Sequence, residues 1–506
     1  MDPADYFVIA AYAVSMLVIG WYYSLGLKTS DDYLLGGRTM NPWMVGLSLF
    51  ATLTSTLSYL AYPGEVVKYG PMMLASLTGY PLAFLLVGWW LIPAIMRVEN
   101  VTSGYELLEL RLGLIGRLMG AGMFVLLRTA WMASILYATS DKVVVPLFGL
   151  EELSWRPPGG WGPWVSVALG LLTVIYTSQG GMKAVVVTDA LQSLIMCAGA
   201  VITIAVVTVA VGGFDWFPRK WAPHWQEPIF WFRTDVRVTF MGALLNMLVW
   251  MVCTAGSDQM AVQRYLSTRD VKSARSSFGV HIFAEILMGC LLACVGLAVL
   301  AYYTKFPGRF GEGADLIQTA DRMFPEFVVH VLPAGLSGIV VAAMLSAAMS
   351  SLSSGMNSAS AVISTDFIGR FSVKRLTHHE QLRLAKLTSV VIGLAAIGLS
   401  TMVGQLAGNL WELCIKVVNL LTAPLFNLFL LALFVPWATP AGGIAGTIAS
   451  VTTAVAVAFF GIFGLEFLWT GPCALTAGST VGILVSLITA PAKSAGRIEI
   501  PEQDRE

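Results

Sequence analysis

Between Ala342 and Asp366, hydroxyl and amide side chains interrupt a stretch that is otherwise apolar. Its polar residues include five closely spaced serines and one asparagine, namely Ser346, Ser350, Ser351, Ser353, Ser354 and Asn357. All but Ser351 share one face of a helix, because residues three and four apart return to the same side. Such a polar stripe serves either close helix packing, for which membrane helices use small residues, or a hard cation such as Na⁺, which prefers oxygen ligands. The segment by itself leaves both explanations open.

A second chemical group is the carboxylate of Asp189, which follows the letters GGMKAVVVT at the start of an apolar run. An unpaired carboxylate inside a membrane is costly, so either a bound cation or a basic partner is expected beside it. Lys183, close by in the sequence, offers the alternative of a salt bridge or a role at the helix end.

Two basic residues, Arg128 and Lys416, also fall inside apolar runs. An anionic substrate would balance their charge. Pairing with Glu412 and Asp141 is the alternative, as is extension of the long side chain toward the membrane surface. Arg128 lies deep in its run, which favours a ligand or an internal ion pair, whereas Lys416 lies near the predicted outer end.

The composition indicates which elements must position these groups. The 506 residues are 57% hydrophobic and only 12% charged, whereas about 25% of residues are charged in soluble domains. We therefore predict an all-α polytopic membrane protein with about 13 runs near the roughly 20 residues needed to cross a bilayer. Their approximate ranges are 5–26, 43–62, 71–96, 116–148, 161–180, 184–211, 237–257, 277–303, 328–366, 384–405, 408–435, 440–462 and 472–490. The ninth is long enough to project beyond the bilayer or to bend.

An odd number of spans places the two termini on opposite sides of the membrane. Basic residues are more frequent in the segments that would be cytoplasmic if the N-terminus lies outside, so we predict an outer N-terminus and a cytoplasmic C-terminus. Asp2 and Asp5 precede the first apolar run and no small-residue cleavage site follows it, which predicts a retained helix. The expected location is the cell membrane, the inner membrane in a bacterial source, with the lipid bilayer as partner.

The sequence lacks the motifs that are typical of several other classes of protein. The six cysteines fall in apolar runs without metal-type spacing, which argues against a disulfide or zinc framework. A net charge of zero without a concentrated basic patch argues against a nucleic-acid partner. The chain has no GxxxxGK[ST], HExxH or GxSxG motif, so we predict neither an enzyme nor an ATP-driven pump.

Four motifs and the serine stripe occur together in an order that resembles one transporter family. The motifs are DDYLLGGR at 31–38, GLSLFATLTSTLSYLAYPGE at 46–65, GGMKAVVVTDALQ at 180–192 and DQMAVQRYL at 258–266. Over about residues 5–435 the chain is similar to the solute:sodium symporter family, which includes carriers of proline, sugars, sialic acid, iodide and monocarboxylates.

The resemblance implies the leucine-transporter-like fold, a 5+5 inverted repeat in which broken helices expose backbone carbonyls near the membrane midplane. Residues 1–506 would form one transmembrane transporter domain. Its parts would be the first helix and loop 1–40, the first repeat 41–211, the second repeat 235–435, two extra helices 436–490 and a cytoplasmic tail 491–506. The broken helix would be the second span, where Thr52 to Ser58 is rich in poor helix formers.

The same resemblance implies Na⁺ as the coupling ion, with one or two ions bound. The ligands of a shared Na⁺ site would be the carbonyls of Ala51, Thr54 and Ala347 and the hydroxyls of Ser350 and Ser351. A second Na⁺ site would use Asp189 with Ser350, Ser353 and Ser354, and the presence of these serines favours an ion over a salt bridge at Asp189. Arg264 of the DQMAVQRYL motif is expected at the cytoplasmic mouth, where a carboxylate could pair with it.

For the substrate, the implied contact residues are Ser55, Ser58, Tyr59, Arg128, Trp131 and Lys416. The letters PGEVVKYG at 63–70 are similar to the branch carrying monocarboxylates, iodide and vitamins, so we predict uptake of a small organic anion such as a monocarboxylate. Relative to the sialic acid carriers, Arg128 is displaced by about one turn, and two polar positions become Leu53 and Leu77.

Other functions remain as alternatives. They are Na⁺ symport of sialic acid, of a sugar or polyol, or of an amino acid, and, in another class, a transporter-like membrane sensor. A channel is disfavoured because the expected ion ligands lie in a helix bundle and not in a filter ring. We expect a monomer as the functional unit.

Overall fold

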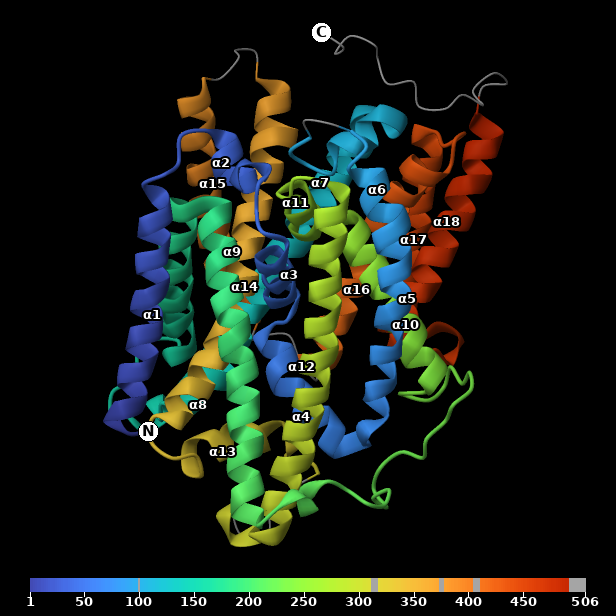
Figure 1. Ribbon diagram of the computed structural model, residues 1–506. Helices are drawn as coiled ribbons and strands as arrows, with labels where there is room; N and C mark the ends of the chain where they lie inside the picture. The colour runs from blue at the N-terminus through green and yellow to red at the C-terminus, as the bar shows by residue number, and fades with distance from the viewer. Residues whose placement is uncertain (99–100, 311–316, 373–376, 404–409, 491–506) are drawn as a thin grey trace.

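The computed structural model describes residues 1–98, 101–310, 317–372, 377–403 and 410–490, and all regular structure within them is helical. Figure 1 shows the helices in a bundle in which α1 begins at one end and α18 finishes at the other. The α-helices are α1 Pro3–Ser24, α2 Ser30–Leu35, α3 Pro42–Leu53, α4 Thr56–Tyr69, α5 Gly79–Leu86, α6 Ile92–Ile95, α7 Glu106–Tyr137, α8 Val145–Leu147, α9 Trp161–Val211, α10 Phe240–Ser257, α11 Gln259–Leu266, α12 Val271–Lys305, α13 Ala320–His330, α14 Leu336–Val362, α15 His378–Val403, α16 Leu410–Phe434, α17 Pro440–Phe460 and α18 Thr470–Thr489.

Within the described residues, ten helices are long and apolar enough to cross a membrane, and one bent pair adds an eleventh span. Helix α9 has 51 residues, which at about 1.5 Å per residue is more than twice the length that one bilayer crossing needs. Its helical path breaks at Gly181, where φ is 60° and ψ is −160°. Thus α9 is long enough for the two predicted spans 161–180 and 184–211 and is interrupted between them. The total of 13 spans stays a prediction.

The predicted break in the second span is confirmed. Helices α3 and α4 meet at an angle of 66°, and the two residues between them, Thr54 and Ser55, have extended backbone angles. The Ser55 side chain caps α4 by accepting a hydrogen bond from the Ser58 N–H. Hydroxyl side chains compete with the helix for backbone hydrogen bonds, which explains why the chain leaves the helix at this point.

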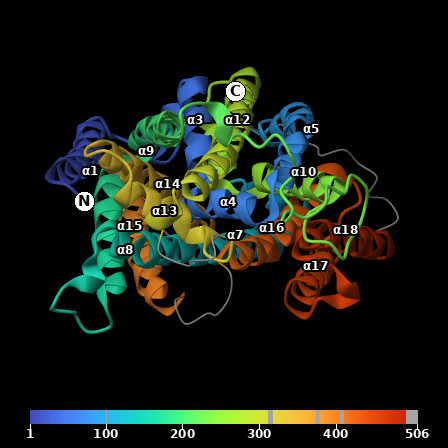
Figure 2. The ribbon, with the colours of Figure 1, turned by 90° about the horizontal axis from the view of Figure 1, so that it is seen from below.

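Helix α14 carries the serine stripe and is the most enclosed of the long helices. Nearly nine-tenths of its span is buried, and it contacts α1, α3, α4, α7, α9 and α15. Figures 1 and 2 show it in the interior, whereas α17 and α18 pack together at one edge of the bundle. A helix buried all round needs small residues to let its neighbours approach. At Gly355, for example, an added Cβ would meet the Met132 sulfur at 2.7 Å.

The predicted ninth span at 328–366 is wrong in its first residues. Helix α13 ends at His330 and α14 starts at Leu336, with Gly335 at a φ of 83° in the turn between them. The start of α14 is held by Asp5 of α1, whose carboxylate accepts hydrogen bonds from the Gly335 N–H at 2.7 Å and the Gly338 N–H at 2.8 Å. An anion at this position satisfies N–H groups that have no acceptor within the helix.

Candidate functional site

The carboxyl end of α3 lies against the middle of α14, where the predicted shared Na⁺ ligands come together. The Ser350 hydroxyl is 2.7 Å from the carbonyl oxygen of Ala51 and 3.3 Å from that of Ala347. The Ser351 hydroxyl donates to the carbonyl of Thr52 at 2.9 Å. Ala51, Thr52, Ala347, Ser350 and Ser351 are all buried. A buried group of hydroxyl and carbonyl oxygens fits a hard cation such as Na⁺.

The fifth predicted ligand, the carbonyl of Thr54, lies at the break between α3 and α4, next to these groups in the chain. The Thr54 hydroxyl points elsewhere and donates to the carboxylate of Glu285 at 3.3 Å. Thr54 therefore stands between the oxygen cluster on α14 and a second set of polar residues on α12.

Asp189 lies buried among hydroxyl groups of α3 and α14, close to the same cluster. Its Oδ2 accepts from the Ser48 hydroxyl at 2.6 Å and from the Ser354 hydroxyl at 3.1 Å. Its Oδ1 makes no hydrogen bond within the described residues. Ser353, the other predicted ligand, donates to the carbonyl of Ser350 at 3.0 Å. An unpartnered buried carboxylate oxygen beside serine hydroxyls fits a second cation, which stays a prediction.

A basic partner also reaches Asp189, and it is Arg264 rather than Lys183. The Arg264 guanidinium lies 2.9 Å from Asp189 Oδ2, and both side chains are almost fully buried. The same guanidinium donates to Ser48 at 2.9 Å and to the carbonyl of Met260 at 2.8 Å. Arg264 therefore holds α11 against α3 and α9 and neutralises one oxygen of the carboxylate.

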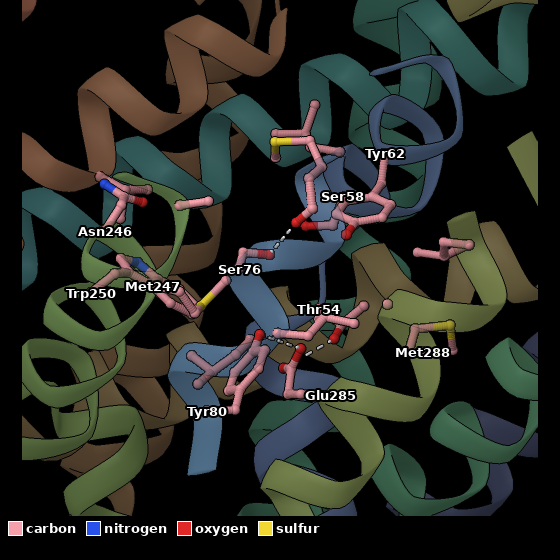
Figure 3. Close-up of a pocket in the computed structure, with 18 of the residues that line it drawn as sticks. Thr54, Ser58, Tyr62, Ser76, Tyr80, Asn246, Met247, Trp250, Glu285 and Met288 are labelled. Atoms are coloured by element: carbon pink, nitrogen blue, oxygen red, sulfur yellow. Dashed lines mark hydrogen bonds between the residues drawn. The ribbon is translucent and has the colours of Figure 1, made fainter. Parts of the chain in front are cut away.

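A cavity opens on the other side of the broken helix, between α4, α10, α12 and the 3₁₀ segment Pro71–Thr78 (Figure 3). Its polar lining comes from Thr54, Ser58, Ser76, Asn246 and Glu285, and its aromatic lining from Tyr62, Tyr80, Trp131 and Trp250. The apolar wall includes Leu53 and Leu77. Mostly apolar walls with a few placed polar groups are typical of solute pockets.

Of the predicted substrate residues, Ser58 and Trp131 line this cavity. Ser55 is buried beneath it as the cap of α4. Tyr59 is buried away from it, and its hydroxyl donates to the carbonyl of Met196 at 3.0 Å. Lys416 lies outside the residues whose side chains are described.

Arg128 does not line the cavity either. Its guanidinium is buried and bonded to the carboxylate of Asp258. Asp258 in turn caps α11 by accepting from the Met260 N–H at 2.8 Å. The sequence allowed an internal ion pair for Arg128 as an alternative, but it indicated Asp141 and Glu412 as the acidic partners. Of those, Asp141 pairs with Lys142, and Glu412 lies outside the described side chains.

Sequence reasoning missed Glu285. It is the one charged side chain among the described residues that line the cavity. The signal was present in the letters HIFAEILMG, because a carboxylate inside an apolar span is rare without a function. The described residues contain no group of three or more His, Cys, Asp or Glu side chains that could hold a metal ion, so the oxygen clusters above are the cation sites to consider.

Comparisons with known proteins identify the family of the chain. The model of the sodium:solute symporter family matches residues 33–450. The chain is 29% identical to the sodium/sialic acid symporter of Proteus mirabilis, over 96% of this chain and 95% of that protein. It is 31% identical to the rabbit sodium-dependent multivitamin transporter, over 89% of this chain and 69% of that protein. The human sodium-coupled monocarboxylate transporter 1 is 29% identical over 88% of this chain and 71% of that protein.

Two solved structures fix the fold. A substrate-bound, outward-open Na⁺-coupled sialic acid symporter has a TM-score of 0.79 at 25% identity, covering 97% of this chain and 99% of that one. The nucleobase-cation-symport-1 transporter Mhp1, in a closed conformation, has a TM-score of 0.56 at 14% identity, covering 94% and 99%, and shows the leucine-transporter-like fold alone. The chain is therefore a Na⁺-coupled symporter and belongs to the sodium:solute symporter family.

Proposed function

We propose that the protein takes up a small organic anion, such as a monocarboxylate or sialic acid, together with Na⁺. The observation that carries the proposal is the placement of the break between α3 and α4. The last carbonyls of α3 face the serines of α14 on one side, and the first turn of α4 lines the cavity on the other.

This placement explains how ion and solute are coupled. Both bind to one irregular segment around Thr54 and Ser55, so an ion that fixes this segment also shapes the cavity. Each ligand then raises the affinity of the other by the same factor. Each ion that moves inward through 100 mV releases about 2.3 kcal/mol, which drives the solute against its own gradient.

The start of α4 is the proposed anchor for a carboxylate. The first N–H groups of a helix have no acceptor within the helix and carry a partial positive charge, which attracts anions. Leu57 and Ser58 bring this helix end to the cavity wall, and Ser55 holds its geometry. Arg128 is already paired with Asp258, so the helix end takes the role that the sequence gave to Arg128.

We also propose how many Na⁺ ions bind, how many chains form the functional unit and on which side of the membrane each terminus lies. One Na⁺ would bind between the carbonyls of Ala51, Thr54 and Ala347 and the hydroxyls of Ser350 and Ser351. A second would bind at Asp189 with Ser350, Ser353 and Ser354. A monomer would suffice, because ion ligands and cavity come from one chain. The N-terminus would face outward and the C-terminus the cytoplasm. Sugar, polyol or amino acid symport and solute sensing remain the competing functions.

The deciding experiment is thermal unfolding of the purified protein in Na⁺ and in K⁺, alone and with acetate, lactate, pyruvate, nicotinate, sialic acid, glucose or proline. We expect Na⁺ to raise the unfolding temperature and an organic anion to raise it further, since ligands that bind the folded state stabilise it. Equal unfolding temperatures in Na⁺ and K⁺ for every solute would reject Na⁺ symport. If glucose raises the unfolding temperature and no organic anion does, an anionic substrate is rejected.

A further inference from the structure

The carboxylate of Glu285 faces the solute cavity from α12 and is only partly satisfied there. It accepts one hydrogen bond from the Thr54 hydroxyl at 3.3 Å and one from the Tyr80 hydroxyl at 3.1 Å, as Figure 3 shows. An ionised carboxylate has about four acceptor positions. Glu285 therefore retains capacity for further donors on the side of the cavity.

No arginine or lysine among the described residues forms an ion pair with Glu285. Among the described residues, the basic side chain within 4 Å of the carboxylate is His281, one turn earlier on α12, whose Nδ1 lies 3.9 Å from Glu285 Oε1. This is beyond hydrogen-bond distance, and neither ring nitrogen of the buried His281 has a hydrogen-bond partner within the described structure. A carboxylate in this setting is costly for the fold, so a role in binding explains why it is there.

The cavity thus has two different polar regions. The N-terminal turn of α4 with Ser58 suits a negative group, whereas Glu285 suits a group that donates hydrogen bonds. A plain carboxylic acid offers nothing to Glu285 and would bring a second negative charge into the same cavity. An acid that also carries a hydroxyl or an ammonium group offers a partner to both regions.

Resting on the proposed function, we propose that Glu285 is a substrate-recognising residue that accepts hydrogen bonds from the solute. The transported anion is then a hydroxy acid or an amino acid, and a simple monocarboxylate is a poor substrate. The apolar and aromatic walls, including Trp131 and Trp250, contact the carbon skeleton.

The test compares acids of one carbon skeleton that differ only in the donor. Binding of propionate, L-lactate and L-alanine, and of phenylpropionate, phenyllactate and phenylalanine, is measured on the full-length protein in Na⁺, with sialic acid as a larger hydroxy acid. We expect the donor-bearing members of at least one series to bind on the order of tenfold more tightly than the parent acid. The affinity for L-lactate compared with that for L-alanine then shows whether the site recognises a hydroxyl or an ammonium group.

The variant E285Q removes the charge at nearly constant size and should abolish this preference. E326Q, on the partly exposed Glu326 of α13, is the matched control and should leave it unchanged. Wild-type selectivity tests the proposal even if E285Q fails to fold.

The two possible failures are distinct. Equal Na⁺-dependent binding of parent and donor-bearing acids, or a preference unchanged in folded E285Q, overturns the role of Glu285 and leaves symport intact. Absence of Na⁺-dependent binding for every solute overturns the proposed function, and the role of Glu285 with it.

Discussion

The guanidinium of Arg128 is bound to the carboxylate of Asp258, which joins the middle of α7 to the start of α11 inside the bundle. Both side chains are buried, and Arg128 Nε makes no further hydrogen bond within the described residues. A buried pair of this kind gives little net stability, but the loss of one partner leaves an uncompensated charge. The relationship makes Arg128 a positioning residue for α11, the helix that also carries Arg264.

Replacing Arg128 tests this role directly. Arg128→Gln should lower the free energy of unfolding by about 3–5 kcal/mol, because Asp258 is left buried and unpaired. The double variant with Asp258→Asn should recover part of this loss. Thermal unfolding of the two variants and uptake of an anionic and a neutral solute provide the measurement. A selective loss of anion uptake in a stable Arg128→Gln protein would instead place Arg128 in contact with substrate.

The shared Na⁺ site predicts a change in sodium dependence at Ser350. Ser350→Ala removes one hydroxyl ligand, so we expect the Na⁺ concentration for half-maximal uptake to rise by about fivefold, on the scale of one hydrogen bond. Ser400→Ala, which also removes a buried hydroxyl but on α15, is the matched control. An unchanged sodium dependence in Ser350→Ala would remove this residue from the ion site.

Asp189 predicts a change in the number of coupled ions. Asp189→Asn keeps the size of the side chain but removes the charge that a second Na⁺ would need, so the number of ions per solute should fall from two to one. Charge movement per transported solute in proteoliposomes gives this number. Two coupled ions in the variant would assign Asp189 to the ion pair with Arg264 alone.

The break in the helical path of α9 predicts that any side chain at position 181, in place of Gly181, destabilises the protein. The φ of +60° at this position disfavours any side chain, and an added Cβ would lie 2.7 Å from the carbonyl oxygen of Tyr33. Gly181→Ala should therefore destabilise the protein by about 1–3 kcal/mol. Gly398→Ala, where nothing lies within 4 Å of the added Cβ, should change the unfolding temperature little. Similar results for the two variants would show that the break tolerates a side chain.

Much of this site could be anticipated because its chemistry is local in the sequence. The run from Thr52 to Ser58 is poor in helix formers, and the chain breaks there. The stripe serines of α14 other than Ser351 share a face, and Ser350 and Ser351 meet the carbonyls of Ala51 and Thr52. Contacts between distant segments were not predictable in the same way. Nothing in the sequence near Arg128 or Asp189 identifies Asp258 or Arg264 as their partners, since only the packing of α7, α9 and α11 brings these charges together.

Ser350 and Ala51 lie on two separate helices, α14 and α3, and the Ser350 hydroxyl donates to the Ala51 carbonyl at 2.7 Å. A cation bound by both would lose its ligands if α3 and α14 moved apart by one or two ångströms, because bonds from hard cations to oxygen tolerate little stretching. The lifetime of an ion bound there would then be set by how often these helices separate, and not by the strength of any single ligand. Measured Na⁺ release rates would therefore report the opening frequency of the carrier itself.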